Sequence, residues 1–240
     1  MKWLSVVAMA VLIAGSCSQK SDDALVSDTS AAPASETTVA AAPSIEGLPA
    51  GDYKLDPAHS TLIFSASHLG FSNYTAQFTK FSADLKLDPA NPNDAVLTAS
   101  VDPASLWLPS PPAGFVDEIK GKNWIDAPQF PQITFHSTTV AKTSDNTANV
   151  AGDLTLHGVT APIMLEIVFN GGYAGHQYEP MARLGFSAHG AFKRSDFGIA
   201  YGIPSPGSNM GVSDEIKVTI EAEFTGPPWK DAPVATPPAN

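Results

Sequence analysis

Apolar and polar residues alternate with a period of two along most of the chain between Tyr53 and Phe224. The clearest run is the last, where one face carries Val218, Ile220, Ala222 and Phe224, and the other carries Lys217, Thr219, Glu221 and Glu223. This period predicts strands with one buried and one solvated face, as in antiparallel sheets. No strand–helix–strand spacing is present, so the pattern indicates an all-β fold.

Further strands are predicted from the same alternation, and turn-forming residues separate them near 88–94, 144–146, 157–160 and 170–172. Short connections between about eight strands are typical of a sandwich or a barrel. A continuous strand from Tyr74 to Leu87 would favour the barrel, which leaves no open edges. The other predicted strands are 62–68, 95–101, 133–137, 150–156, 161–169 and 180–192.

One segment, Ser110–Trp124, has a different pattern and predicts a short helix against one end of the barrel. Ser110 can cap a helix, Pro111 suits its first position, and Asp117 and Glu118 fall in its early part.

The first 17 residues read as a signal peptide that ends in a lipobox. A lysine is followed by an apolar run, Trp3–Ile13, which is too short to span a bilayer, and then by small residues and Cys17. Cys17 is the one cysteine of the chain, and a mature exported domain rarely keeps an unpaired cysteine. We therefore predict lipidation of Cys17 over cleavage nearby, and a location in the periplasm or cell envelope.

The flanks of the β domain have compositions that predict irregular chain. Residues 18–49 are rich in Ala, Ser, Thr and Pro, without an aromatic residue, and predict a disordered tether with a reach of roughly 30 Å. Residues 226–240 form a Pro-rich tail. One domain is therefore expected at 50–225, with a membrane contact only through the lipid anchor.

The charge of this domain argues against nucleic acid as a partner. Between residues 49 and 225 there are 18 acidic and ten basic residues, a net charge of −8, without Lys or Arg clusters. An acidic domain of this kind is compatible with a neutral or apolar ligand.

Catalytic and metal-binding patterns are weak, and they predict neither an enzyme nor a metal site. The six histidines show no metal-ligand spacing, and no G-x-S-x-G elbow, phosphate loop or H-E-x-x-H helix occurs. Asp56 and His59 in LDPAHS are close enough for a local hydrogen bond within a turn. His68 lies on the apolar face of its predicted strand. We therefore predict that its imidazole lies in the core or at the rim of the β domain.

Three charged residues, Arg194, Asp196 and Asp214, allow two interpretations. Arg194 and Asp196 would share one face of a strand. They would then either clamp a ligand headgroup at a pocket mouth or form a salt bridge that fixes a strand end. We favour the salt bridge, which at a surface contributes about 0–1 kcal/mol.

Strand parity places several large apolar side chains inside the barrel, where they would either fill the core or line one small ligand cavity. The candidate ligand-binding residues are Phe64, His68, Phe78, Phe81, Phe135, Leu154, Leu156, Met164, Phe186 and Arg194.

Four segments in this order give the chain a resemblance to the YceI-like family: YKLDPAHSTLIF at 53–64, FPQITF at 130–135, GDLTLHGVTAP at 152–162 and RSDFG at 194–198. His68, Phe78, Phe81 and Trp124 lie between them at matching places. Ala76 departs from the glycine that is frequent there in the family, which affects the expected size of a ligand.

The resemblance implies a lipocalin-like antiparallel barrel with a long apolar tunnel, which binds a polyisoprenoid of the quinone or polyprenyl type and needs no cofactor. Two alternatives stay open: a binder of another small amphiphile, and a stress-related envelope interaction protein with a packed barrel. The oligomeric state also stays open, a homodimer included.

Overall fold

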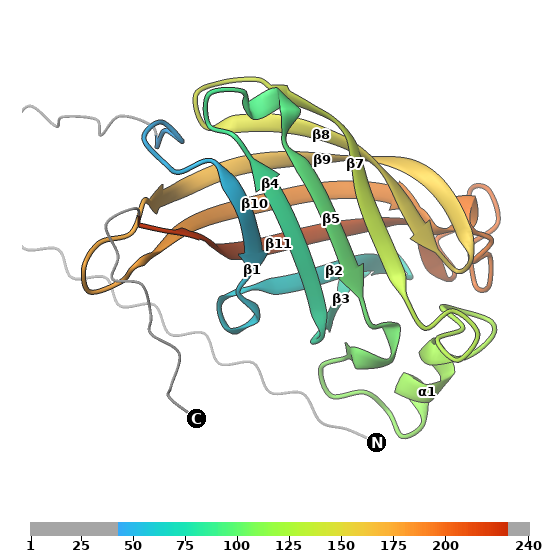
Figure 1. The fold of residues 1–240 in the computed structure, drawn as a ribbon. Helices are drawn as coiled ribbons and strands as arrows, with labels where there is room; N and C mark the ends of the chain where they lie inside the picture. Colours follow the sequence, from blue (N-terminus) through green and yellow to red (C-terminus); the bar gives the residue numbers. More distant parts are fainter. Residues whose placement is uncertain (1–42, 230–240) are drawn as a thin grey trace, which may run out of the picture. The chain divides into compact units, whose positions relative to one another are not determined.

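The computed structural model describes residues 43–229, which form a β-barrel with one short α-helix (Figure 1). The predictions for the signal peptide, Cys17 and most of the tether lie outside this range. The strands are β1 Gly51–Leu55, β2 Thr61–His68, β3 Ser72–Phe78, β4 Phe81–Leu87, β5 Val96–Val101, β6 Leu106–Trp107, β7 Ile133–Lys142, β8 Thr147–Leu156, β9 Val159–Tyr173, β10 Met181–Lys193 and β11 Val212–Pro228; the helix is α1 Phe115–Lys120.

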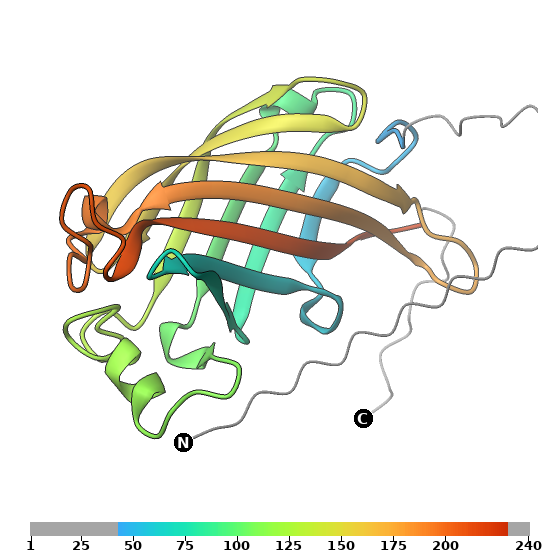
Figure 2. The ribbon, with the colours of Figure 1, turned by 180° about the vertical axis from the view of Figure 1, so that it is seen from behind.

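Eight antiparallel strands close the barrel in the order β1-β4-β5-β7-β8-β9-β10-β11, and β11 pairs with β1 again. The closure depends on the length of β11, which has 17 residues. Near its end Phe224 and Thr225 pair with β1, whereas the stretch from Val212 to Glu221 pairs with β2. Strands β2, β3 and β6 therefore extend the sheet beyond the closed barrel (Figure 2).

The interior divides into two groups of buried side chains. One group surrounds Phe78, Phe135 and Phe197, and α1 packs against it through Phe115 and Ile119. The other surrounds Tyr53, which is fully buried, donates a hydrogen bond from its hydroxyl to the Pro49 carbonyl at 2.5 Å, and has its pKa raised to about 12 by burial. Each half of the barrel thus has its own core.

The predicted strand Tyr74–Leu87 is wrong as one element, because the chain turns a corner at Thr79 and Lys80. The Thr79 amide donates to the Ser105 carbonyl, and the Asp102 amide donates to the Lys80 carbonyl. These bonds end β3 against β6 and start β4 against β5. The inward face changes parity at this corner, from Ala76 and Phe78 on β3 to Ala83, Leu85 and Leu87 on β4, because Thr79 and Lys80 are both exposed.

The predicted helix is present but shorter, and it begins at Phe115 after Gly114 in the left-handed region. Ser110 has φ +46° and does not cap it. A proline disfavours the helical conformation of the residue before it, so Pro111 and Pro112 keep Ser110 and Pro111 out of the helix. Asp117 and Glu118 lie in the first turn, as predicted.

Both flanks contribute more than their composition indicates. Ile45 and Leu48 pack against the core around Tyr53, and β11 continues to Pro228. Within residues 43–229, no helix has the length and apolar character that crossing a bilayer requires.

Gly152 on β8 is required by close packing, because a Cβ atom there would overlap the Phe135 ring and lie 2.7 Å from the His136 carbonyl oxygen. We expect Gly152→Ala to destabilise the fold by about 1–3 kcal/mol, the usual cost of overpacking. Urea denaturation measures this loss. Gly185→Ala on β10 is the matched control, since its Cβ would meet its nearest neighbour at 3.7 Å. An equal loss in both variants would contradict the steric explanation.

Candidate functional site

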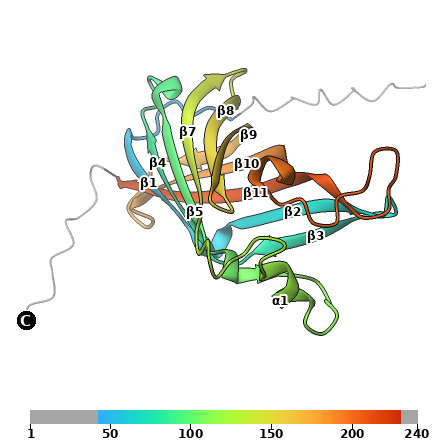
Figure 3. The same ribbon diagram turned by 90° about the vertical axis from the view of Figure 1, so that its right-hand side faces the viewer.

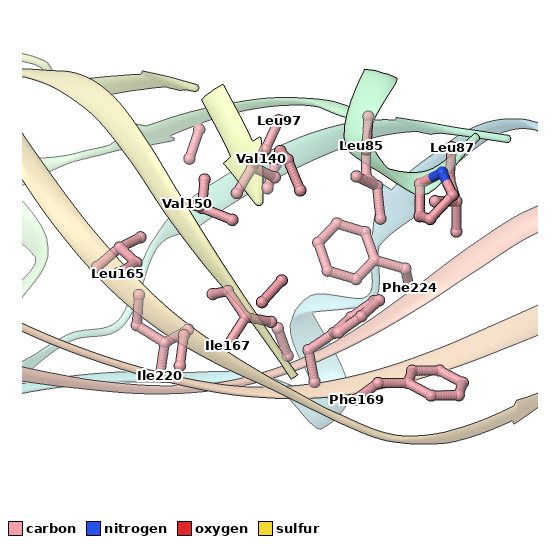
Figure 4. Close-up of a pocket in the computed structure, with 18 of the residues that line it drawn as sticks. Leu85, Leu87, Leu97, Val140, Val150, Leu165, Ile167, Phe169, Ile220 and Phe224 are labelled. Carbon is pink, nitrogen blue, oxygen red and sulfur yellow. The ribbon is translucent and has the colours of Figure 1, made fainter. Parts of the chain in front are cut away.

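A cavity of about 190 Å³ lies inside the barrel, mainly in the half around Phe224, and it also reaches side chains of the other buried group such as Val150 and Leu165 (Figure 4). Its walls come from inward-facing positions of β4, β5 and β7 to β11, with Leu55 of β1 and Leu62 of β2. The labelled side chains of Figure 4 surround the gap: Leu85, Leu87, Leu97, Val140, Val150, Leu165, Ile167, Phe169, Ile220 and Phe224.

Six alanines line the cavity beside four phenylalanines, and their small side chains leave the space open. Ala83 and Ala99 are direct partners on β4 and β5, and Ala222 lies opposite Phe186. Ala95, Ala148 and Ala188 also line the space. In the filled half the Phe64 and Phe78 rings stack with their centroids 5.3 Å apart. Small side chains on adjacent strands therefore leave the space that large side chains fill elsewhere.

Polar side chains reach the cavity at one end, from the hairpin between β7 and β8. They are Lys142, Asp145, Asn146 and Thr147, and the Lys142 Nζ lies 3.9 Å from an Asp145 carboxylate oxygen. The rest of the described lining is hydrocarbon. The site can therefore hold an apolar group with a polar end directed at this hairpin.

The structure brings two of the predicted ligand-binding residues, Phe81 and Phe186, to the cavity. Five others face the interior but pack in the filled half: Phe64, Phe78, Phe135, Leu154 and Leu156. The cavity of this structure therefore covers only part of the lining that the resemblance implies for a long tunnel.

Met164 and His68 do not line the cavity. Met164 is 49% exposed on the outer face of β9, where the inward positions are Leu165, Ile167 and Phe169. A parity error of one residue placed Met164 inside. His68 ends β2 and is exposed, so the apolar face of that strand stops before it.

Arg194 is a buried structural residue, 3% exposed, and the predicted strand face shared with Asp196 is wrong. Residues Arg194–Phe197 form a 3-10 helix, and the guanidinium donates to the carbonyls of Ile199, Tyr201, Val212 and Ser213 at 2.8–3.0 Å. It also lies 5.1 Å from the centroid of the Trp124 ring. Burial lowers the pKa of Arg194 from its ordinary value.

Asp214, which the salt-bridge interpretation paired with Arg194, instead accepts hydrogen bonds from the Ser195 amide and hydroxyl. Carbonyl oxygens are therefore the hydrogen-bond acceptors of Arg194. The preference for a structural role over a headgroup clamp agrees with this geometry, although the bond type is different.

The sequence did contain a signal for the cavity residues that were missed. The alternation assigns Ile220, Ala222 and Phe224 to one inward face, and all three line the cavity. The informative feature was the alanine content of the inward positions, because a row of small side chains on adjacent strands leaves space. This row of alanines can be recognised only when the pairing of β4 with β5 is known, because that pairing places Ala83 opposite Ala99.

A second cluster of polar groups lies outside the cavity, where η1, the 3-10 turn Pro57–His59, meets β10 and β11. Asp56 accepts hydrogen bonds from Arg183 at 2.7 Å and from His59 at 2.9 Å, which confirms the predicted contact between Asp56 and His59. Glu223 lies 3.7 Å from Arg183 and 4.0 Å from His59. Asp56, His59 and Glu223 could converge on a cation, but the Arg183 guanidinium already supplies the positive charge there.

This cluster predicts a stability maximum in weak acid. The hydrogen bonds from Arg183 and His59 hold the pKa of Asp56 well below its ordinary 3.8. The contribution of ionised Asp56 to the stability of the fold is therefore lost as the pH falls below 3.8. The hydrogen bond to Asp56 raises the pKa of His59 above 6.5. The contribution of protonated His59 to stability is therefore fully present below pH 6.5, and it is lost as the pH rises through the raised pKa. We expect the urea midpoint to be highest between about pH 4 and 6.5.

His59→Gln tests the alkaline side of this profile, because glutamine cannot gain a proton. The decrease in the urea midpoint above pH 6.5 should become smaller in this variant, while the decrease below pH 4 persists. An unchanged decrease above pH 6.5 would assign it to other groups.

The fold and the cavity together define a class: a closed, lipocalin-like antiparallel barrel that carries an apolar ligand site. Residues 53–224 match the YceI-like domain, and the chain belongs to this family. It is 36% identical over 174 residues to a UPF0312 protein of Vibrio campbellii, covering 72% of this chain and 88% of the relative. A UPF0312 protein of Pseudomonas putida is 34% identical over 174 residues, covering 72% and 86%.

Solved structures show the same fold. Burkholderia cenocepacia BcnA aligns with a TM-score of 0.59 and 26% identity, over 70% of this chain and 98% of that one. The Campylobacter jejuni YceI protein aligns with a TM-score of 0.55 and 27% identity, over 66% and 88%. A polyisoprenoid binding domain from Saccharophagus degradans has a TM-score of 0.55 at 14% identity, over 73% and 98%, which is a likeness of fold alone.

Proposed function

We propose that this protein binds the apolar tail of an isoprenoid lipid, of the quinone or polyprenyl type, inside its barrel in the bacterial cell envelope. The observation that carries the proposal is the cavity itself, whose wall is hydrocarbon except at the hairpin between β7 and β8. Burial of a CH₂ group there contributes about 0.8 kcal/mol, so a tail gains affinity without a specific polar motif.

The size of the cavity sets how much of a tail it holds. At about 190 Å³ it is smaller than the roughly 300–1,000 Å³ of typical ligand sites, and slightly larger than the roughly 150 Å³ void that takes up benzene. The closed barrel therefore accommodates only a short part of a long tail. A longer tail requires that side chains of the filled half move.

Three observations support the isoprenoid class and the envelope location. The Saccharophagus degradans neighbour, described as a polyisoprenoid binding domain, has this fold. The chain belongs to the YceI-like family. The first 17 residues have the pattern of an export signal that ends at Cys17, which we propose as the lipid-anchored residue.

The polar hairpin supports a specific orientation, with the tail inside and the headgroup against Lys142. A quinone carbonyl or a phosphate could accept a hydrogen bond from this ammonium group. A fatty acid carboxylate could do the same, and Lys142 is the observation that keeps this second ligand class in consideration.

Competition binding tests the proposal directly. A fluorescent apolar probe bound to the full chain should be displaced by geraniol and by farnesol, because the apolar chain of each gains free energy by burial in the cavity. Linear alcohols and fatty acids of equal carbon number are the matched comparison. Displacement by the linear series alone would contradict the isoprenoid assignment and support the other amphiphile class.

A further inference from the structure

Two loops form one projection at the end of the sheet where β2 turns into β3 (Figure 3). One is the β2–β3 turn, Leu69–Phe71, and the other connects η4, the 3-10 helix Arg194–Phe197, to β11. The Leu69 amide donates to the Gly211 carbonyl at 2.9 Å, and Val212 pairs with His68. The two loops are therefore joined to each other, and together they form the tip, which we define as residues 69–71 and 207–211.

The tip presents two large apolar side chains to solvent. Phe71 is 85% exposed and Met210 is 75% exposed, among the highest values for large apolar residues in the described part of the chain. Gly207 and Gly211 have positive φ values, and Gly70 lies against Asn209. The backbone of the tip is therefore shaped by glycines that place Phe71 and Met210 outward, with no core contact to explain them.

The tip is also free of charged side chains, in a domain with a net charge of −8. No Asp, Glu, Lys or Arg occurs between Thr61 and Thr79, or between Gly198 and Ser213. An acidic protein is repelled by anionic surfaces, so a neutral face is the part that can approach a bilayer closely. Exposed apolar side chains that lie together mark surfaces for a protein or a membrane, and Phe71 and Met210 lie on two paired loops.

From these features we infer that the tip inserts Phe71 and Met210 into the surface of a neutral, zwitterionic bilayer. A stable protein interface takes about 800 Å² from each partner, which two projecting side chains on small polar loops do not offer. Insertion into a bilayer has no such requirement, because each side chain gains free energy by its own burial. The partner is thus a lipid surface.

The tip and the cavity are separate sites, so this inference is independent of the proposed function. Along β11, Val212, which directly follows the tip, and Ile220 at the cavity are eight residues apart, or about 26 Å. Changes at the tip should leave ligand capacity unaltered.

An environment-sensitive fluorophore on the tip tests the inference in the full chain. In a Cys17→Ser background, Ser72→Cys provides one labelling site beside Phe71, and Tyr178→Cys provides a matched site, since Tyr178 is 83% exposed on the β9–β10 connection. With phosphatidylcholine vesicles, we expect the label at position 72 to shift its emission to the blue and to lose quenching by aqueous iodide. The label at position 178 should remain in water.

Replacement of the two side chains completes the test. Phe71→Ser together with Met210→Ser, in the Ser72→Cys chain, should increase the lipid concentration needed for the shift tenfold or more. Circular dichroism checks that the fold is kept. A label at position 72 that stays accessible to iodide at saturating lipid overturns the inference, and so does an equal response at position 178. Either result would favour contact of the tip with another protein over insertion into a bilayer.

Discussion

Ala83→Phe should abolish ligand binding while the barrel stays folded. Ala83 lines the cavity and pairs with Ala99, so a ring at this position projects into open space. A benzene ring needs about 150 Å³, which is most of the cavity of about 190 Å³. The ring would then take the place of the tail.

The measurement combines titration of a fluorescent apolar probe with urea denaturation. We expect affinity for the probe to decrease at least tenfold and the free energy of unfolding to change by less than about 1–3 kcal/mol, the cost of overpacking a filled core. Ala191→Phe, on the exposed outer face of β10, is the matched control and should leave both quantities unchanged. Unaltered binding in Ala83→Phe would show that the ligand binds elsewhere.

Arg194→Ala should cause the largest loss of stability of any single change considered, about 3–5 kcal/mol. The substitution leaves four carbonyl oxygens without their donor and removes the contact with the Trp124 ring. Hydrogen bonds to a charged group contribute about 1.5–3 kcal/mol each, although several bonds to one group do not add fully.

Urea denaturation and probe titration separate this structural role from a role in binding. Arg194→Lys should recover part of the loss, because an ammonium group can donate at most three hydrogen bonds where the guanidinium makes four. Affinity for the probe, measured under conditions where each variant is folded, should match that of the unmodified chain. Weakened binding at full stability would assign Arg194 to the ligand.

The sequence predicted the all-β barrel and the short helix, because alternation with a period of two and Pro- and Gly-rich turns are local signals. It did not predict the corner at Thr79 and Lys80, where the alternation shifts by one residue and the chain changes its pairing partner. Hydrogen bonds to Ser105 and Asp102, distant in the sequence, decide that corner. The single predicted strand from Tyr74 to Leu87 is therefore two.

The candidate site was harder to predict, for a related reason. Strand parity shows which residues face inward, but Phe81 and Phe186 reach the cavity while Phe78 and Phe135 pack in the filled half. That division depends on where each residue lies along the barrel, which follows from the register between strands. Parity is also sensitive to a shift of one residue, as Met164 shows.

Mass spectrometry of an organic extract tests the central claim most directly, using protein purified without detergent from its native host. The proposed function predicts an isoprenoid lipid in the extract, in an amount that approaches one per chain, and its loss in Ala83→Phe. An extract without lipid from a folded, stable protein, or one that contains only linear fatty acids, would contradict it.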